Sequence, residues 1–136
     1  MFSHVTVGTT NLQAAIAFYD AILLPLGLVQ RQVTPDGGPK AACWVSPNHS
    51  LPRFYVYMPF NRQPATAGNG SMTAFLASSR AAVDRSYSAG INAGGRDDGA
   101  PGERAQYGAG YYGAYIRDLD GNKIHIVYRG DLFEDA

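Results

Sequence analysis

The first part of the chain alternates between hydrophobic and polar positions and then changes to a helical spacing. Residues 2–7 alternate and carry β-branched side chains, which is typical of a strand. After them, apolar side chains recur at the spacing of one helix face: Leu12, Ala15, Ile16, Tyr19 and Leu23. Thr10 and Gln13 have the pattern of a capping box before this predicted helix, and Pro25 and Gly27 end it.

Three short runs rich in β-forming residues complete the first half. They span residues 28–33, 42–45 and 53–58, and turn-forming residues separate them. Residues 59–70 carry Pro, Asn and Gly without periodicity, so we expect a linker there. The first half therefore predicts the order strand, helix and three strands.

The same order returns in the second half. Predicted strands lie at 71–77, 111–117 and 122–128, and an Asp-Gly turn joins the last two. Ser78 and Ser79 can cap a predicted helix over 80–92. Residues 96–110 are expected to form a loop with one short strand.

A shift of 68 positions aligns the two halves without gaps. It superposes identical residues such as Tyr19 on Tyr87, but the repeated order of elements is the stronger argument. Two such units can bury the apolar faces of their sheets and leave a curved cleft. We therefore predict an α+β fold of two paired βαβββ modules that form a curved mixed sheet around a cleft. The single domain 1–136 would contain module one at about 1–58, a linker at 59–70 and module two at about 71–130.

Composition and charge exclude several classes of protein. The 136 residues are 46% hydrophobic, which is enough for the core of one domain. Eleven basic residues balance eleven acidic ones, which disfavours nucleic acid as a partner. The single cysteine excludes an intramolecular disulfide. No signal peptide or membrane-length apolar run is found, so we expect a cytoplasmic protein without membrane contact.

The most specific motifs stand near the two ends of the chain. Three short motifs near the N-terminus resemble the first strand and helix of one superfamily: HVTV at 4–7, NL at 11–12 and FY at 18–19. This superfamily is that of the glyoxalase/bleomycin-resistance/extradiol-dioxygenase proteins, also called vicinal oxygen chelate proteins. The closing YYGAY and DLDGNKI are similar to its aromatic strand and D-P-D-G-N turn, with Leu119 where Pro is usual. The glycine-rich segment 94–102 resembles a bacterial glyoxalase-like subgroup.

The resemblance implies paired modules, usually assembled as homodimers, with a metal or small-molecule site in the cleft. Metal-using relatives take their ligands from the first and last strands of each module. His4 matches the first-strand position of module one, and Met72 matches its counterpart in module two, where relatives carry His. His125 matches the last-strand position of module two, where relatives commonly carry Glu. The 68-residue shift places Tyr57 at the corresponding position of module one, and Tyr55 lies on the same strand face.

His4 and His125 are therefore the candidate metal ligands, but they do not complete a site. Two imidazoles can begin a zinc, nickel, iron or copper site, and a divalent metal of this kind is the cofactor that the resemblance implies. A catalytic zinc ion usually has three protein ligands and a water. Glu103 and Glu134 are the two glutamates, and they lie in a predicted loop and in the C-terminal tail. We therefore expect a degenerate metal site, with no cofactor certain.

Tyrosines crowd the predicted strands and are the main candidates for ligand binding. The candidate ligand-binding residues are Tyr55, Tyr57, Met72, Tyr111, Tyr115 and Arg117. A tyrosine joins an apolar ring to a polar hydroxyl, which suits a cleft for an amphipathic molecule and equally suits a sheet core or a dimer seam. Arg104 and Arg117 flank this region and can pair with a ligand carboxylate or remain solvated.

Two other signals point to no function. The residues GAGYYG at 108–113 match a dinucleotide-binding pattern, but a strand and not a helix is predicted to follow. Cys43 lies between apolar residues of a predicted strand, which predicts a buried, inert thiol.

These observations predict a glyoxalase/bleomycin-resistance-like protein that binds a small organic molecule in a cleft, as a homodimer. The alternative is a metal-dependent enzyme, a lyase, isomerase or dioxygenase, that acts on a small vicinal-oxygen substrate. A third hypothesis is a degenerate enzyme that is kept for an unrecognised task. The fold does not choose among these functions, and the sequence does not specify the ligand.

Overall fold

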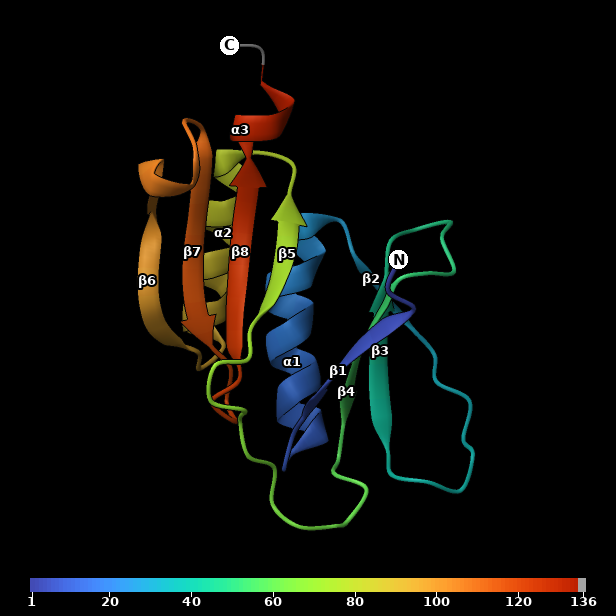
Figure 1. Cartoon of the computed structure of the whole chain (residues 1–136). Coiled ribbons are helices and arrows are strands. Elements are labelled where there is room, and N and C mark those ends of the chain that lie inside the picture. The colour runs from blue at the N-terminus through green and yellow to red at the C-terminus, as the bar shows by residue number, and fades with distance from the viewer. Residues whose placement is uncertain (135–136) are drawn as a thin grey trace.

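The computed structural model describes residues 1–134 as two four-stranded sheets with helices packed between and behind them (Figure 1). The first module contains β1 (His4–Gly8), α1 (Leu12–Leu23), the 3-10 helix η1 (Leu24–Leu26), β2 (Val29–Arg31), β3 (Ala41–Val45) and β4 (Arg53–Tyr57). The second contains β5 (Thr73–Ala77), α2 (Arg80–Asn92), β6 (Arg96–Glu103), the 3-10 helix η2 (Ala105–Tyr107), β7 (Tyr111–Arg117), β8 (Lys123–Arg129) and α3 (Gly130–Phe133). The predicted α+β class with two βαβββ modules is confirmed.

Each module builds one sheet, and the two sheets have equivalent strand orders. Sheet A has the order β1-β4-β3-β2, and sheet B has the order β5-β8-β7-β6. The first strand runs parallel to the last strand in each module, and the other pairs are antiparallel. β1 and β5 are therefore edge strands, each beside the strand that closes its module.

The start of α1 corrects one prediction from the sequence. Its N-cap is Asn11 and not Thr10, because Asn11 has the extended backbone of an N-cap and its Oδ1 accepts the backbone N–H of Ala14 at 3.1 Å. The Thr10 hydroxyl instead accepts the backbone N–H of Ala65 at 2.9 Å. A tertiary contact with the linker therefore replaces the expected capping box.

The second module contains one accurate and one inaccurate boundary prediction. α2 begins and ends where the sequence predicts, and the Ser79 hydroxyl accepts the backbone N–H of Ala82 at 3.0 Å. β6 has eight residues and is longer than the short strand expected. Its pairing with β7 shifts register between Asp97 and Gly99 and again between Gly99 and Gly102. Such irregularities interrupt the alternation by which a strand is recognised in a sequence.

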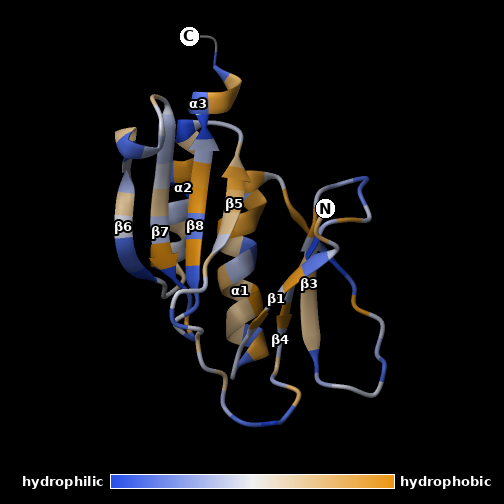
Figure 2. Ribbon diagram, in the orientation of Figure 1, coloured by the Kyte–Doolittle hydropathy of each residue, from blue (hydrophilic) through white to orange (hydrophobic). Residues whose placement is uncertain are grey.

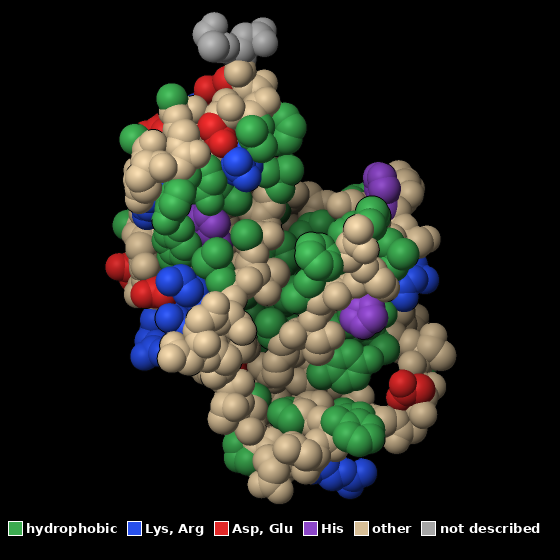
Figure 3. All heavy atoms as spheres, viewed as in Figure 1, with side chains coloured by type: hydrophobic (Ala, Val, Ile, Leu, Met, Phe, Trp, Pro, Cys, Tyr) green, Lys and Arg blue, Asp and Glu red, His purple; other side chains and the backbone are tan. Residues whose placement is uncertain are grey.

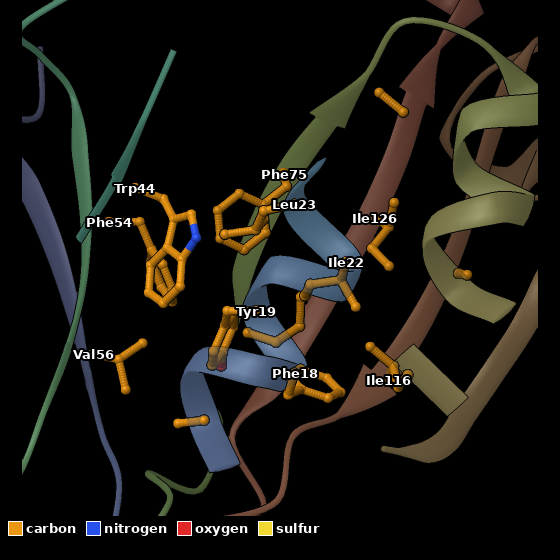
Figure 4. Packing of buried hydrophobic residues seen from close by; sticks show 14 of the residues in the cluster. Phe18, Tyr19, Ile22, Leu23, Trp44, Phe54, Val56, Phe75, Ile116 and Ile126 are labelled. Carbon is orange, nitrogen blue, oxygen red and sulfur yellow. The ribbon is translucent and has the colours of Figure 1, made fainter. Parts of the chain in front are cut away.

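The hydrophobic core surrounds α1, which lies between the two sheets (Figure 4). Figure 4 shows four side chains of α1 at its centre: Phe18, Tyr19, Ile22 and Leu23. Trp44, Phe54 and Val56 of sheet A pack on one side, and Ile116 and Ile126 of sheet B pack on the other. Burial of this many large apolar side chains is the main contribution to stability, at roughly 1.5–3 kcal/mol for each fully buried side chain.

The helices cover the inner faces of the sheets and leave the opposite faces open. α2 packs on β6, β7 and β8, and α1 packs on α2 and on strands of sheet A. β8 is largely hydrophobic, whereas the long loops are mixed or hydrophilic (Figure 2). Among residues 1–134, no helix combines the length and the apolar character that a membrane crossing would need.

Candidate functional site

The outer face of each sheet is the face that points away from the helices. Side chains alternate along a strand, so residues between core positions point outward. On sheet A, the outer residues of β1 and β4 are His4, Thr6, Gly8, Arg53, Tyr55 and Tyr57. On sheet B, the outer residues of β7 and β8 are Tyr111, Gly113, Tyr115, Arg117, Lys123, His125, Val127 and Arg129. The predicted site residues of β1, β4, β7 and β8 thus lie on these two faces.

The register of the two parallel strand pairs decides which tyrosine corresponds to His125. Thr6 of β1 pairs with Tyr55, and Ala74 of β5 pairs with His125. Thr6 and Ala74 are 68 positions apart, as are the first residues of α1 and α2. Tyr55 is therefore the counterpart of His125 in sheet A, and Tyr57 lies one outward position further along.

His125 stands in a stack of aromatic rings on the outer face of sheet B. Its ring lies 4.1 Å from the Tyr115 ring at an interplanar angle of 11°, and 5.8 Å from the Tyr111 ring at 18°. Gly113 between the two tyrosines makes this possible, because a Cβ there would lie 2.6 Å from His125 Cε1. Tyr111, His125 and Tyr115 therefore form an aromatic row, in which His125 lies between the two tyrosines and is only 1% exposed.

Both ring nitrogens of His125 have hydrogen-bond partners. Nδ1 lies 2.8 Å from the carbonyl oxygen of Ala114, which can only accept, so Nδ1 carries the proton. Nε2 lies 2.7 Å from the Tyr111 hydroxyl and therefore accepts its hydrogen bond in the neutral ring. Burial lowers the pKa of His125, and the nearby cations add to this effect. The imidazole is thus a neutral group whose two polar atoms are both engaged.

Cations stand at both ends of the aromatic row. The Arg129 guanidinium lies 5.0 Å from the centre of the Tyr111 ring. At the other end, Lys123 Nζ and the Arg104 guanidinium lie 5.0 Å and 5.7 Å from the centre of the Tyr115 ring. Positive charge over an aromatic face is attracted by the electrons of the ring. Lys and Arg side chains also gather at the surface over one end of sheet B (Figure 3).

The outer face of sheet A has a different arrangement around Tyr55. The His4 ring meets the Tyr55 ring edge-on at 5.5 Å, and Arg53 donates to the Tyr55 hydroxyl at 3.2 Å. Tyr55 and Tyr57 line a cavity of about 240 Å³, together with Cys43 and residues of the 31–36 segment. Cys43 is buried as predicted, and burial raises the pKa of its thiol.

The remaining predicted residues lie apart from these groups. Met72 precedes β5 and is 47% exposed. Arg117 donates to Asp98 Oδ2 at 3.0 Å and to the carbonyl oxygen of Gly121 at 3.1 Å. Within the chain, His4 belongs to sheet A and His125 to sheet B. The structure therefore brings His4 to Tyr55 and His125 to two tyrosines, so within one chain the two candidate metal ligands lie on different sheets.

Asp118 was not among the residues predicted to be important, although the DLDGN motif that contains it was noted. Asp118, in the turn between β7 and β8, is buried and accepts the Tyr19 hydroxyl. It also accepts the backbone N–H groups of Asp120 and Asn122. The DLDGN motif that marks this turn was the available signal, and its role is to join the second module to α1.

The donor groups of the described part of the chain do not gather into a metal-ligand cluster. No group of three or more His, Cys, Asp or Glu side chains in residues 1–134 is placed to hold a metal ion. The ring of His4 instead lies against Tyr55, and the ring of His125 lies against Tyr111 and Tyr115.

Comparisons with solved structures give a consistent picture. A glyoxalase/bleomycin resistance protein from Albidiferax ferrireducens T118 is 39% identical, with a TM-score of 0.77 over 95% of this chain and 98% of that chain. A glyoxalase-related enzyme from Fulvimarina pelagi is 17% identical, with a TM-score of 0.70 over 95% of this chain and 88% of that chain. A lactoylglutathione lyase from Agrobacterium tumefaciens is 18% identical, with a TM-score of 0.64 over 99% of this chain and 97% of that chain.

The last two similarities show the fold alone, while the first extends to the sequence over nearly the whole chain. No protein-family model and no curated protein sequence matches the chain. The two βαβββ modules, the DLDGN turn and the identity to the Albidiferax protein agree with one another. The chain belongs to the glyoxalase/bleomycin resistance protein/dioxygenase superfamily.

Proposed function

We propose that the protein binds a small organic molecule on the outer faces of its sheets, at a site that has lost the superfamily's metal-binding groups. The observation that carries this proposal is the environment of His125. Its Nδ1 donates to a backbone carbonyl and its Nε2 accepts from Tyr111, so no lone pair remains for a metal ion. Metal binding at His125 would require the Tyr111 hydrogen bond to break.

The other candidate ligands support the same conclusion. Tyr55, the counterpart of His125, receives a hydrogen bond from Arg53, and a cation at this distance opposes the binding of a second cation. Met72 offers a thioether, which suits copper(I) and not the harder divalent ions. The residues at the matched positions therefore do not fit a catalytic divalent metal, and a metal-free binding site explains them better.

The aromatic residues supply a suitable binding surface. Tyr55 and Tyr57 line the cavity on sheet A, and Tyr111 and Tyr115 stand on the outer face of sheet B. Tyrosines provide rigid apolar area together with hydroxyl groups, which is the composition of many small-molecule sites.

A homodimer would complete this site. Exposed apolar side chains lie on or beside the edge strands: Val5 of β1, Met72 just before β5 and Leu76 of β5 are 37%, 47% and 55% exposed. Exposed edges and apolar patches favour association with a second copy. In such a dimer, the outer face of sheet A in one subunit would face that of sheet B in the other and enclose a cleft.

Metal analysis and titration calorimetry test the proposal. Protein purified without a histidine tag should contain no stoichiometric zinc, nickel, iron or copper, and titration with Zn²⁺ or Ni²⁺ should show no tight binding. A fragment library screened by thermal shift should contain compounds that stabilise the protein, with smaller shifts in a Tyr111→Leu variant. Stoichiometric, tight metal binding by the parent protein would overturn the proposal in favour of a metal-dependent enzyme.

A double variant serves as the positive control for metal binding. Met72→His with His125→Glu restores the ligand types that the resemblance implies beside His4. This variant should bind Ni²⁺ at least about tenfold more tightly than the parent, because imidazole and carboxylate replace a thioether and an engaged imidazole. The single Met72→His variant should remain close to the parent protein.

A further inference from the structure

At the Tyr115 end of the aromatic row, cationic side chains outnumber the carboxylates that neutralise them. Lys123 and Arg117 share one carboxylate, that of Asp98, at 3.6 Å and 3.0 Å. The Arg104 guanidinium also stands over Tyr115, and its one hydrogen bond within the described residues goes to the carbonyl oxygen of Ala100 at 2.9 Å. This region therefore has an excess of cationic groups over carboxylates.

Nearby carboxylates are already engaged elsewhere. Glu103, next to Arg104 in the chain, pairs with Arg80 at 3.0 Å. Asp131 pairs with Arg129 at 2.8 Å, at the opposite end of the aromatic row. Neither carboxylate is paired with Arg104 in the described part of the chain, so most of the donors of this guanidinium remain available.

Two glycines of β6 leave the space in which Arg104 lies. A Cβ at Gly102 would approach Arg104 Nη1 to 3.0 Å, and a Cβ at Gly99 would approach Nη2 to 3.4 Å and Tyr115 Cδ2 to 3.0 Å. The Arg104 side chain therefore lies back along β6 and reaches the Tyr115 ring. The irregular backbone of β6 therefore determines where the Arg104 guanidinium lies.

We propose that this end of the outer face of sheet B binds the carboxylate of a small organic anion, with Arg104 as the main binding residue and Lys123 in support. The inference rests on the proposed small-molecule binding and names the chemical class of the ligand. A guanidinium is a planar fork whose paired N–H groups match the two oxygens of a carboxylate. The neighbouring tyrosine rings offer apolar area to the organic part of such a ligand.

Titration with benzoate and with benzamide tests this inference, because the two probes have nearly the same shape and differ in charge. Amide chemical shifts in ¹⁵N-labelled protein report both the affinity and the site. Benzoate should cause saturable shifts around residues 99–104 and 111–123, and benzamide should bind at least about tenfold more weakly. Arg104→Gln should weaken benzoate binding at least about tenfold, and unchanged shifts elsewhere would show that the variant is folded.

Arg85→Gln is the matched control, because Arg85 is an exposed arginine of α2, outside this face. It should leave benzoate binding unchanged. Equal weakening by Arg85→Gln and Arg104→Gln would reveal an effect of net charge only and overturn the inference. Equal binding of both probes, insensitive to Arg104→Gln, would overturn the carboxylate assignment while small-molecule binding stands. Absence of saturable shifts with either probe would overturn the inference, and the fragment screen would then judge the proposed function separately.

Discussion

The hydroxyl of Tyr19 in α1 donates a hydrogen bond to Asp118 Oδ2 at 2.5 Å, and this contact joins the first module to the turn between β7 and β8. Asn122 strengthens the connection, because its Nδ2 donates to both Asp118 Oδ2 and the carbonyl oxygen of Gly8, each at 2.9 Å. The turn between the last two strands of module two therefore contacts both α1 and β1. A buried hydrogen bond to a charged group contributes more than a bond between neutral groups.

Tyr19→Phe should lower the free energy of unfolding by about 1–3 kcal/mol, because a buried carboxylate loses one of its donors. Denaturant unfolding followed by circular dichroism measures this change. Tyr87→Phe is the matched control, since Tyr87 is the counterpart of Tyr19 in α2 and its hydroxyl donates to the exposed Asp97 at 2.8 Å. The control should change stability by about 0.5 kcal/mol or less. Equal effects of the two substitutions would contradict the special role of the buried contact.

His125 should make stability depend on pH in the weakly acidic range. Its pKa in the folded protein is lowered by burial, so the unfolded chain takes up a proton more readily as the pH falls through about 6.5. Stability should therefore be complete above this pH and decrease below it, by at most about 1.4 kcal/mol per pH unit. Most carboxylates titrate below pH 5, so unfolding measured between pH 7 and 5 separates the contribution of histidine from that of the carboxylates.

The pH dependence can be assigned by comparing two substitutions. His125→Gln should flatten the stability profile between pH 7 and 5. His49→Gln, in an exposed loop, should leave the profile as it is in the parent protein. A profile that keeps its slope in the His125→Gln variant would contradict the assignment.

Gly113→Ala should displace His125 from the aromatic row. The added Cβ would lie 2.6 Å from His125 Cε1 and 3.1 Å from the carbonyl oxygen of Ile126, so the ring or the strand must move. We expect a loss of about 1–3 kcal/mol in unfolding free energy and a changed tyrosine signal in near-ultraviolet circular dichroism. Gly8→Ala, on the outer face of sheet A, meets its nearest heavy atom at 3.3 Å in the linker and should cost less.

Leu76→Glu should weaken the proposed homodimer. Leu76 lies on the edge strand β5 and is 55% exposed, and burial of a carboxylate in a dimer contact would be costly. Light scattering coupled to gel filtration should give a dimer mass for the parent and a lower mass for the variant at micromolar concentration. Leu132→Glu, in α3, substitutes another exposed leucine and should leave the mass unchanged. A monomeric parent protein would contradict the dimer proposal directly.

The sequence alone determined the order of elements, the repeated βαβββ unit and the boundaries of α2. These features depend on local patterns: the apolar spacing of one helix face, a serine N-cap and alternating strands bounded by glycine and proline. The superfamily could also be recognised from short motifs, because the DLDGN turn and the opening strand stand in the printed residues themselves.

The tertiary structure decided the features that depend on distant partners. Thr10 binds Ala65 of the linker, which leaves the capping of α1 to Asn11, and β6 becomes a strand through irregular pairing with β7. Whether Tyr55 or Tyr57 is the counterpart of His125 could be decided only from the register of the parallel pairs β1–β4 and β5–β8. The position and hydrogen bonds of the His125 ring depend on its neighbours Gly113, Ala114 and Tyr111, which only the folded structure brings together. Hydrogen-bond partners and strand registers are set by packing across the whole chain, so local composition predicts which residues reach a face but not which of their polar atoms remain free.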